Sequence, residues 1–355
     1  MPPTTGVWVR RTPEPGGGVA MRAAWYERPG PAHQVLIVGT MPVPWPAPGE
    51  VRVKIAVSGV HRRDAVKRHG RRGPGMTFPR VIPHDDGAGV IDAVGRGVDA
   101  RRLGQRVWIY LAQSYRPFGT AAEYAVVPAV QAVPLPAGVP FDQAAGMGVP
   151  GIIAHRAVFE DGPVDGRLVL VTGALCTVGR AAVTMARRGG AVVIATVHGP
   201  SRLEAALAAG AHYAVDVSRG GAAARIGAIA PYGVDRVVEG AFGADLAADP
   251  EIVAHGGTIA VHSSDRADPA VPYRRLADKN ITVHFLGHDD FPDEANRQAT
   301  ADLTAALRDG DLWYPVAARF PLERIAEAHA AAENGSPAGH IVLELDPAGA
   351  RPDPA

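Results

Sequence analysis

The 355-residue chain is 47% hydrophobic, a balance that excludes disorder and a membrane span and favours two domains of unequal size. Its 36 basic and 36 acidic residues cancel, so the charge favours neither a nucleic acid nor a charged surface as partner, and we expect a neutral small molecule. The single cysteine excludes an internal disulfide framework and a zinc site made of thiolates, which favours an intracellular, cytoplasmic protein.

The two ends of the chain differ in composition from the rest. Residues 1–20 contain proline and glycine runs without the apolar stretch of a signal peptide, and they predict a flexible leader. Residues 347–355 predict a flexible tail.

The first half of the remaining chain has the pattern of short strands separated by turn residues. The predicted strands are MRAAWY, EVRVKIAVSGV, GAGVIDAVG, QRVWIYLAQ and AAEYAVVP. Apolar residues alternate or run together in them, and Gly, Pro and Asp separate them. This half predicts a compact β-barrel.

The pattern changes at about residue 141, where DQAAGMGVPGIIAHRAVF has the apolar spacing of a helix. Strands then alternate with helices from RLVLVTG to NITVHFLG, which predicts an α/β domain with a doubly wound parallel sheet. Two helices follow residue 289, ANRQATADLTAALRDG and PLERIAEAHAAAENG. We expect the strands VAARF and HIVLELD to return to the barrel half.

The segment VLVTGALCTVGRAAV predicts a strand, a dinucleotide-binding turn and a helix. Backbone N–H groups at a helix start hold a cofactor pyrophosphate, and glycines permit the tight turn. The G-x-G-x-x-G positions are occupied by Ala174, Cys176 and Gly179, so the motif is incomplete. The candidate cofactor residues here are Gly173, Ala174, Cys176, Thr177, Val178 and Gly179. The alternative is a turn that only connects a strand to a helix.

The end of the following strand favours NADPH as cofactor. An Asp or Glu at this position selects NADH through the ribose hydroxyl, whereas a 2′-phosphate requires cations and hydroxyls. The segment AVVIATVHGPSRLEA ends its strand without an acid and offers Thr196, His198, Ser201 and Arg202. The alternative for Arg202 is an ordinary solvated helix residue.

These motifs together resemble a known family. MRAAWYERPG, GEVRVKIAVSGV, GAGVIDAVGRGVD, GQRVW, FGTAAEY, VPLPAGV, GAHYAVDV, GVDRVVEG and GGTIAV occur in the order found in zinc-independent quinone oxidoreductases. This zeta-crystallin-like branch belongs to the medium-chain dehydrogenase/reductase superfamily. The resemblance extends from about Met21 to Leu345, nearly the whole chain.

The resemblance implies a GroES-like domain from residues 21–142 and 289–346, a Rossmann NADPH-binding domain from residues 143–288, and a cleft between them. It further implies a homodimer that transfers a hydride from NADPH to a quinone or an α,β-unsaturated carbonyl. We expect further cofactor contacts from Ile153, Phe242, His262 and Leu286. In such a reaction the cofactor supplies the hydride, and the protein binds and orients the cofactor and the substrate.

The sequence departs from the family pattern around the inferred cleft. His61 replaces the usual Asn, Asp64 is retained, Val66 replaces a Tyr, and Ile153 replaces a Thr. We expect His61 and Asp64 to be catalytic, with His61 as proton donor, because an imidazole can give or take a proton near neutral pH. The alternative is a histidine that only shapes the cleft.

The positions that hold catalytic zinc in other members carry different residues in this chain. His61, Asp85, Asp86 and Val149 occupy these positions, and the four clustered cysteines of a structural zinc lobe are missing. A catalytic zinc needs three protein ligands, so no metal site is predicted.

Cys176 occupies the position of the glycine that lets backbone and phosphate approach most closely. Its Cβ should push the cofactor outward or shift the turn, and NADPH affinity is expected to differ from that of the family. A reactive thiol is conceivable at a helix start, but the sequence pairs it with no base.

Two alternative functions stay open. One is an enzyme on the same fold that performs a redox-neutral tailoring step. The other is a non-catalytic NADPH-binding protein that regulates a partner.

Overall fold

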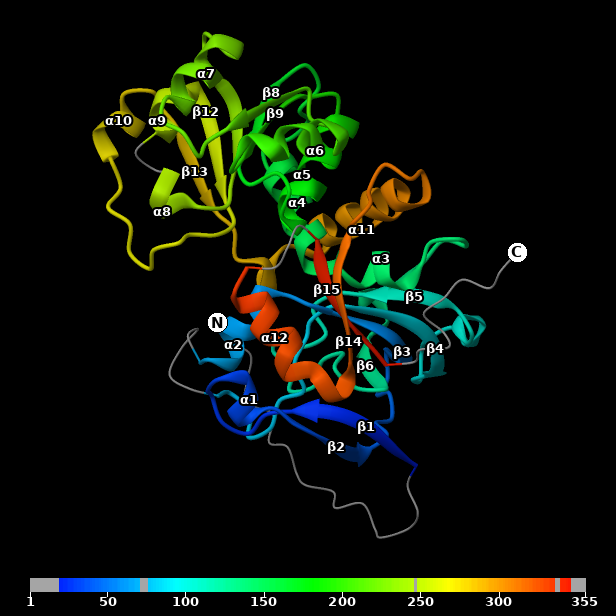
Figure 1. The fold of residues 1–355 in the computed structure, drawn as a ribbon. Coiled ribbons are helices and arrows are strands. Elements are labelled where there is room, and N and C mark those ends of the chain that lie inside the picture. The colour runs from blue at the N-terminus through cyan, green and yellow to red at the C-terminus, as the bar shows by residue number, and fades with distance from the viewer. Residues whose placement is uncertain (1–18, 71–75, 246–247, 336–338, 346–355) are drawn as a thin grey trace.

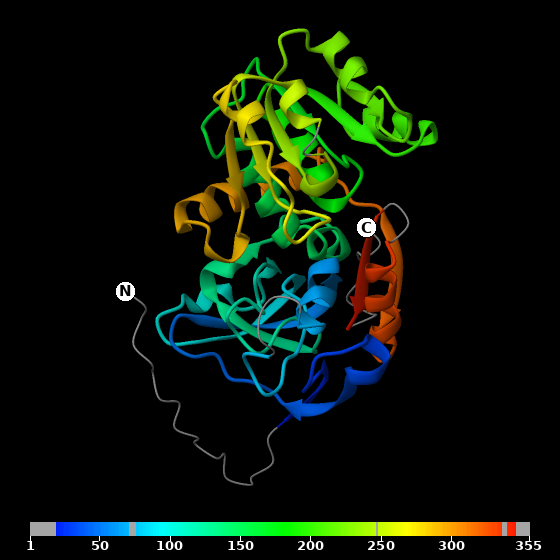
Figure 2. The same ribbon diagram turned by 90° about the vertical axis from the view of Figure 1, so that its left-hand side faces the viewer.

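The computed structural model describes residues 19–70, 76–245, 248–335 and 339–345. The predicted tail and all but the last two residues of the predicted leader lie outside these ranges. The chain forms two bodies, one around a mostly antiparallel sheet and one around a parallel sheet (Figure 1). Figure 2 shows the same two bodies from the side, with the orange and red C-terminal strands against the blue and cyan barrel strands.

The barrel body contains a seven-stranded sheet of order β14-β15-β3-β4-β5-β7, with β6 pairing β3. In β3, Val51, Val53 and Ile55 are buried, which follows from the apolar alternation of the sequence. The C-terminal strand β15 pairs antiparallel with β3, so the prediction that the end of the chain returns to the barrel is confirmed. The strands of this body are β1 (Ala20–Trp25), β2 (Ile37–Pro42), β3 (Glu50–Val60), β4 (Gly87–Val94), β5 (Arg106–Ile109), β6 (Tyr124–Pro128), β7 (Ala132–Pro134), β14 (Val316–Pro321) and β15 (His340–Glu344).

The second body contains a six-stranded parallel sheet of order β10-β9-β8-β11-β12-β13. Val169 and Val171 pack into one hydrophobic core and Leu170 into another, so the sheet is covered on both faces. The predicted doubly wound domain is therefore confirmed. Its strands are β8 (Leu168–Val171), β9 (Val192–Val197), β10 (Tyr213–Asp216), β11 (Val234–Glu239), β12 (Val253–Val261) and β13 (Thr282–Phe285).

Helices cover both bodies. The α-helices are α1 (Ala32–Val35), α2 (Arg62–Arg68), α3 (Phe141–Ala145), α4 (Gly148–Phe159), α5 (Thr177–Arg188), α6 (Leu203–Ala208), α7 (Ala222–Ile229), α8 (Phe242–Asp245), α9 (Asp249–Ile252), α10 (Tyr273–Ala277), α11 (Asp293–Arg308) and α12 (Ile325–Glu333). Short 3-10 turns are η1 (Ala100–Arg102), η2 (Ala129–Gln131), η3 (Pro200–Arg202), η4 (His288–Asp290) and η5 (Leu322–Arg324). Among the described residues, no helix is long and apolar enough to cross a membrane.

The helix predicted from about residue 141 to 159 is divided into α3 and α4. The ring of His340 packs so closely on Gly146, and the carboxyl of Asp86 on Gly148, that a Cβ at either glycine would lie within 2.5 Å of them. Helix α3 packs against β3 and β4, whereas α4 packs against α5 and α11. Tertiary packing on two different bodies thus overrides the continuous apolar spacing. The exact domain boundaries, 142/143 and 288/289, stay predictions.

Candidate active site

A cavity of about 830 Å³ is lined by residues of both bodies. The parallel-sheet body contributes the turn after β8 and the ends of β9 and β12, and the barrel body contributes the end of β3 and the start of α2. The cleft brings together ten of the predicted site residues: His61, Ile153, Gly173, Cys176, Thr177, Val178, Thr196, His198, Arg202 and His262.

The turn after β8 has the geometry of a dinucleotide site. Gly173 has a φ of 59°, which favours glycine. Its N–H donates to Thr196 Oγ1 at 3.2 Å, and the Ala174 N–H donates to the Thr196 carbonyl at 3.1 Å. A Cβ at Gly179 would lie 2.4 Å from the Gly173 carbonyl oxygen, so α5 packs tightly on the turn. These contacts fix the turn, and the first residues of α5, Thr177 and Val178, line the cleft.

Cys176 is the N-cap of α5. Its φ of −74° and ψ of 169° are ordinary extended values, so the position does not need glycine for conformational reasons. Its Sγ accepts a hydrogen bond from the Gly179 N–H at 3.2 Å. The thiol thus occupies an N–H group that a phosphate could otherwise use.

Five predicted cofactor residues do not line the cleft. Ala174 and Gly179 are buried within the turn, and Ser201 is exposed in η3. Phe242 packs edge-on against Phe285 with ring centroids 5.4 Å apart, and Leu286 packs beside the larger core. Ala174 and Gly179 still shape the turn, whereas contacts from the other three to the cofactor stay predictions.

An acid that sequence reasoning missed lies beside the strand expected to select NADPH. Asp216 ends β10 directly opposite Val197 of β9. Its Oδ1 accepts from the N–H groups of Gly199 at 2.7 Å and Ser218 at 2.9 Å. Hydrogen bonds from Ser218 and from Gly199 lower the pKa of Asp216 to about 2. The acid at the end of YAVDV was the available signal, and only the strand pairing shows where it lies.

His61 faces Asp86 across the start of α2. Its Nε2 lies 2.9 Å from Asp86 Oδ2, and Asp86 also accepts from the Val149 N–H at 2.8 Å. Asp86 is fully buried. Burial of His61 lowers its pKa, but the hydrogen bond and charge of Asp86 outweigh this effect and the pKa is raised. Burial raises the pKa of Asp86 as well, so a proton is held between the two side chains at the edge of the cleft.

Asp64 lies outside the cleft lining. Its Oδ2 accepts from the His61 N–H at 2.7 Å, and the residue is buried with 2% of its surface exposed. Burial raises the pKa of Asp64 to about 6. This contact holds the backbone of His61 at the helix start, and a catalytic role for Asp64 stays a prediction.

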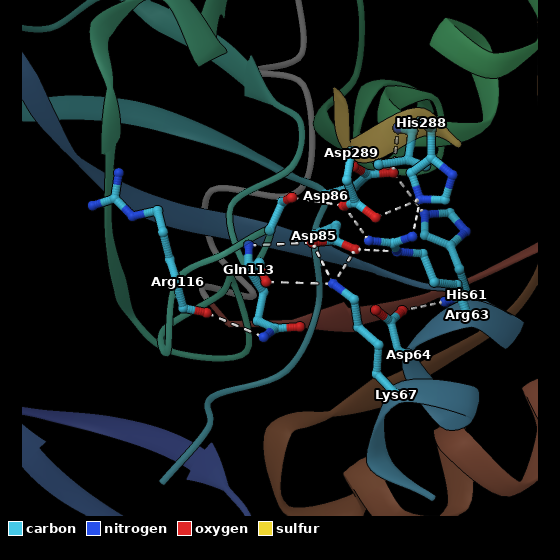
Figure 3. Close-up of polar contacts among 12 residues, drawn as sticks. His61, Arg63, Asp64, Lys67, Asp85, Asp86, Gln113, Arg116, His288 and Asp289 are labelled. Atoms are coloured by element: carbon cyan, nitrogen blue, oxygen red, sulfur yellow. Dashed lines mark hydrogen bonds and ion pairs between the residues drawn. The ribbon is translucent and has the colours of Figure 1, made fainter. Parts of the chain in front are cut away.

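An ionic network joins α2 to η4 beside His61 (Figure 3). Arg63 donates from Nε to Asp85 Oδ2 at 2.7 Å and from its terminal nitrogen to Asp289 Oδ1 at 2.6 Å, and it contacts His288. Lys67 Nζ lies 2.9 Å from Asp85 Oδ2. Burial raises the pKa of Asp85, but Lys67 and Arg63 outweigh it, and the pKa is lowered. Sequence reasoning missed this network, although the segments HRRDAVKR, IPHDDG and GHDDF contain its charges.

Two other histidines, His84 and His155, make hydrogen bonds within the protein. His84 Nδ1 lies 2.9 Å from Ser58 Oγ, and its Nε2 lies 3.0 Å from His329 Nε2. His155 Nε2 lies 2.9 Å from Asp302 Oδ2.

Family models match most of both bodies. The model described as "Alcohol dehydrogenase GroES-like domain" matches residues 47–137, and "Zinc-binding dehydrogenase" matches residues 177–300. Human quinone oxidoreductase is 30% identical over 309 residues, which cover 85% of this chain and 91% of the relative. The human synaptic vesicle membrane protein VAT-1 homolog is 27% identical over 325 residues, which cover 86% of this chain and 81% of the relative.

Solved structures share the fold over nearly the whole chain. An NAD-dependent alcohol dehydrogenase has a TM-score of 0.81 and 27% identity, covering 92% of this chain and 100% of its own. A mycobacterial quinone oxidoreductase has a TM-score of 0.79 and 26% identity, with coverages of 91% and 99%. A mycobacterial protein complexed with NADPH has a TM-score of 0.78 and 25% identity, with the same coverages. The chain therefore belongs to the quinone oxidoreductase branch of the medium-chain dehydrogenase/reductase superfamily, and it is an oxidoreductase that uses a pyridine nucleotide.

Proposed function

We propose that this enzyme is a zinc-independent reductase that transfers a hydride from NADPH to a quinone or an α,β-unsaturated carbonyl. One observation carries the proposal: the same cleft contains the dinucleotide turn and His61 paired with the buried Asp86. A hydride donor and a proton donor can therefore meet at one place.

The chain's own residues bind and orient the two reactants. The backbone from Gly173 to Val178 and the start of α5 would hold the pyrophosphate, and Ile153 forms part of the apolar wall. When bound, the nicotinamide supplies the hydride. Val60 and Val197 end strands and Thr177 starts a helix, so the regular elements hold these parts of the cleft in place before the substrate arrives.

His61 supplies the proton. Reduction of an enone adds a hydride at its β-carbon and needs one proton to complete the saturated carbonyl. The His61 imidazole lines the cleft with its Nε2 2.9 Å from Asp86 Oδ2, and we expect the protonated ring to release its proton to the substrate. Solvent then restores the proton to the imidazole.

Zinc independence rests on the contacts of the residues at the zinc positions. His61 is paired with Asp86, Asp85 is bound by Arg63 and Lys67, and Val149 has no ligand atom in its side chain. We expect dialysis against a chelator to leave the turnover unchanged. Loss of activity that added zinc restores would contradict this part of the proposal.

The preference for NADPH rests on Arg202, which lines the cleft after β9. Asp216 acts against this preference, because its negative charge lies near the same strand end and would repel a 2′-phosphate. This carboxylate is, however, bound to backbone N–H groups. Arg202→Gln should weaken NADPH binding and leave NADH binding unchanged, as measured by fluorescence titration. An equal loss for both nucleotides would show that Arg202 does not contact the 2′-phosphate.

Turnover tests the function as a whole. The wild-type enzyme should consume NADPH in the presence of a quinone or an enone. His61→Gln should lower kcat by about 10²- to 10⁴-fold with little change in the Kd for NADPH. The exposed His255→Gln serves as the matched control.

Two outcomes would overturn the proposal. An enzyme that binds NADPH and reduces neither acceptor class is not this reductase. Conversion of a substrate without net consumption of NADPH would instead support the redox-neutral alternative.

A further inference from the structure

Three polar side chains from distant parts of the chain meet at the short bend between α3 and α4. The carboxyl of Asp86 packs on Gly148, and the ring of His340 packs on Gly146. Tyr314 joins them, because its ring meets the His340 ring edge-on with centroids 5.8 Å apart. The bend therefore gathers a carboxyl, an imidazole and a phenol beside the cleft.

Each of these three side chains has one buried polar atom without a hydrogen-bond partner in the described part of the chain. The atoms are Asp86 Oδ1, Tyr314 Oη and His340 Nδ1. Asp86 and Tyr314 are fully buried, and His340 is 2% exposed. A buried polar atom that makes no hydrogen bond is costly, so three of them around one bend indicate a bound molecule that satisfies them.

The hydrogen-bonding roles of these atoms follow from their surroundings. His340 Nε2 lies 2.8 Å from the carbonyl oxygen of Asp142, which can only accept, so Nε2 carries the ring proton and Nδ1 is an acceptor. Burial lowers the pKa of His340 to about 4, so the ring is neutral near pH 7. Burial, with smaller effects of Cys176 and Asp86, raises the pKa of Tyr314, so its hydroxyl keeps its proton and can donate.

One ordered water satisfies all three atoms. It can donate to Asp86 Oδ1 and to His340 Nδ1, and it can accept from Tyr314 Oη. Buried waters typically make about three hydrogen bonds to polar groups that otherwise have no partner. A metal ion is the poorer match, because no group of three or more His, Cys, Asp or Glu side chains among the described residues could hold one.

The partners of this water are held in place by other contacts. The Tyr314 N–H donates to Gln143 Oε1 at 2.8 Å, and Gln143 Nε2 donates to the Tyr314 carbonyl oxygen at 3.0 Å. These two bonds attach the backbone of Tyr314 to α3. Asp86 Oδ2 accepts from the Val149 N–H and lies 2.9 Å from His61 Nε2, so Oδ1 is the oxygen that remains for the water.

We propose that Tyr314 is a positioning residue for the pair of His61 and Asp86, and that it acts through one ordered water bound to Asp86 Oδ1, Tyr314 Oη and His340 Nδ1. This inference rests on the proposed function, in which His61 supplies the proton. The water donates to the oxygen of Asp86 that does not face His61, and it stabilises the negative charge that remains when the pair loses its proton. The phenol orients and polarises this water, so it weakens the hold of the pair on its proton.

The other titratable groups that face the pair or the water site stay in the chain when the phenol is shortened. They are Asp64 of α2, Asp85 before β4, Asp142 of α3, and Cys176 and Arg180 at the start of α5. Because Tyr314→Phe removes one oxygen atom and none of these groups, it isolates the effect of the hydroxyl and its water.

NMR titration of the enzyme with ¹⁵N-labelled histidine measures the pKa of His61 without turnover, and His61→Gln assigns the signal. Tyr314→Phe should raise this pKa by about 0.5 to 1 pH unit, the effect of one lost hydrogen bond, and should move the alkaline limb of kcat to higher pH by the same amount. Tyr110→Phe is the matched control, because Tyr110 is also buried but lies near Asp293, and it should leave the His61 pKa unchanged.

A crystal structure of the wild-type enzyme that resolves ordered waters gives a second measurement, which does not depend on the folding of a variant. One water should lie within about 3.2 Å of all three atoms. A site without this water would overturn the inference. An unchanged His61 pKa in folded Tyr314→Phe, or an equal change in Tyr110→Phe, would overturn it as well.

The two proposals fail in different ways. If Tyr314→Phe raises the His61 pKa but the wild-type enzyme reduces no acceptor, the water site stands and the proposed hydride transfer fails. If the enzyme reduces an acceptor but the His61 pKa is the same in wild type and Tyr314→Phe, the hydride transfer stands and the role of Tyr314 fails.

Discussion

The Sγ of Cys176 and a phosphate oxygen would use the same kind of donor at the start of α5. The thiol accepts from the Gly179 N–H, and its Cβ projects from the N-cap of the helix. The backbone at Cys176 is unstrained, so the substitution acts on the ligand more than on the fold. The altered motif is therefore compatible with a formed turn.

Cys176→Gly should tighten NADPH binding by about 3- to 10-fold, because it frees one N–H group and removes the Cβ from the phosphate position. Fluorescence titration of the two proteins measures the change. Cys176→Ser, which keeps both a Cβ and a capping acceptor, should remain close to wild type. Equal or weaker NADPH binding by Cys176→Gly would contradict the prediction.

The His61 and Asp86 pair predicts a particular pH dependence. Because Asp86 raises the pKa of His61, the proton donor is present at low pH and is lost as the pH rises through this raised pKa. The kcat should therefore fall on the alkaline side. Asp86→Asn removes the negative charge, so the alkaline limb should move to lower pH. If the alkaline limb does not move in Asp86→Asn, a group other than His61 causes it.

At the scale of elements, a buried chain of hydrogen bonds ties α2 and α12 to β3. Arg68 donates to His329 Nδ1 at 2.9 Å, so the proton of a neutral His329 sits on Nε2. His329 then donates to His84 Nε2 at 3.0 Å, and His84 donates from Nδ1 to Ser58 Oγ at 2.9 Å. The direction of every bond follows from the arginine, which cannot accept.

This chain predicts acid sensitivity. Burial lowers the pKa of His84 to about 3, and burial also lowers that of His329. The unfolded chain binds these protons near the ordinary histidine pKa and the folded chain does not, so stability falls as the pH falls from about 6.5 toward 3. His84 should contribute roughly 1.6 kcal/mol to the loss between pH 6.5 and 5, and His329 acts in the same direction.

Urea unfolding of wild type and His329→Asn at these two pH values measures the effect. The variant should be less stable at neutral pH and should lose less stability on acidification. His255→Gln provides the exposed control. An equal loss in all three proteins would show that the buried pair does not cause the acid sensitivity.

At the scale of the whole molecule, β13 leaves one edge of the parallel sheet without a partner among the described strands. Phe285 on this strand is 68% exposed, and Tyr273 in the preceding helix is 79% exposed. An exposed strand edge with apolar neighbours favours pairing with another chain. This edge is the surface on which we expect the predicted homodimer to form.

Light scattering after size exclusion should give a dimer for wild type and a shift toward monomer for Phe285→Lys, because the substitution places a charge at the strand edge. Tyr232→Lys, at a residue that is 92% exposed elsewhere, should remain a dimer. A monomeric wild-type protein at micromolar concentration would refute the prediction.

Local sequence patterns were sufficient to predict the fold and part of the candidate site. The alternation of β-strands and helices predicts the parallel sheet because each pattern reflects which face is buried. The glycines at 173 and 179 predict the turn because a positive φ and a close helix approach exclude other side chains. His61 was identified because it stands where the family carries another residue.

Contacts between distant segments were decided only by the tertiary structure. Asp86 lies beside His61, and Arg63 reaches Asp289 across 226 positions of sequence. Phe242 is buried in the core around Leu170, and its contact to the cofactor stays a prediction. A residue's own sequence neighbourhood indicates its backbone conformation, although packing divided the helix predicted at 141–159. Which charge a residue meets depends on how the two bodies pack together, and no local pattern encodes that arrangement.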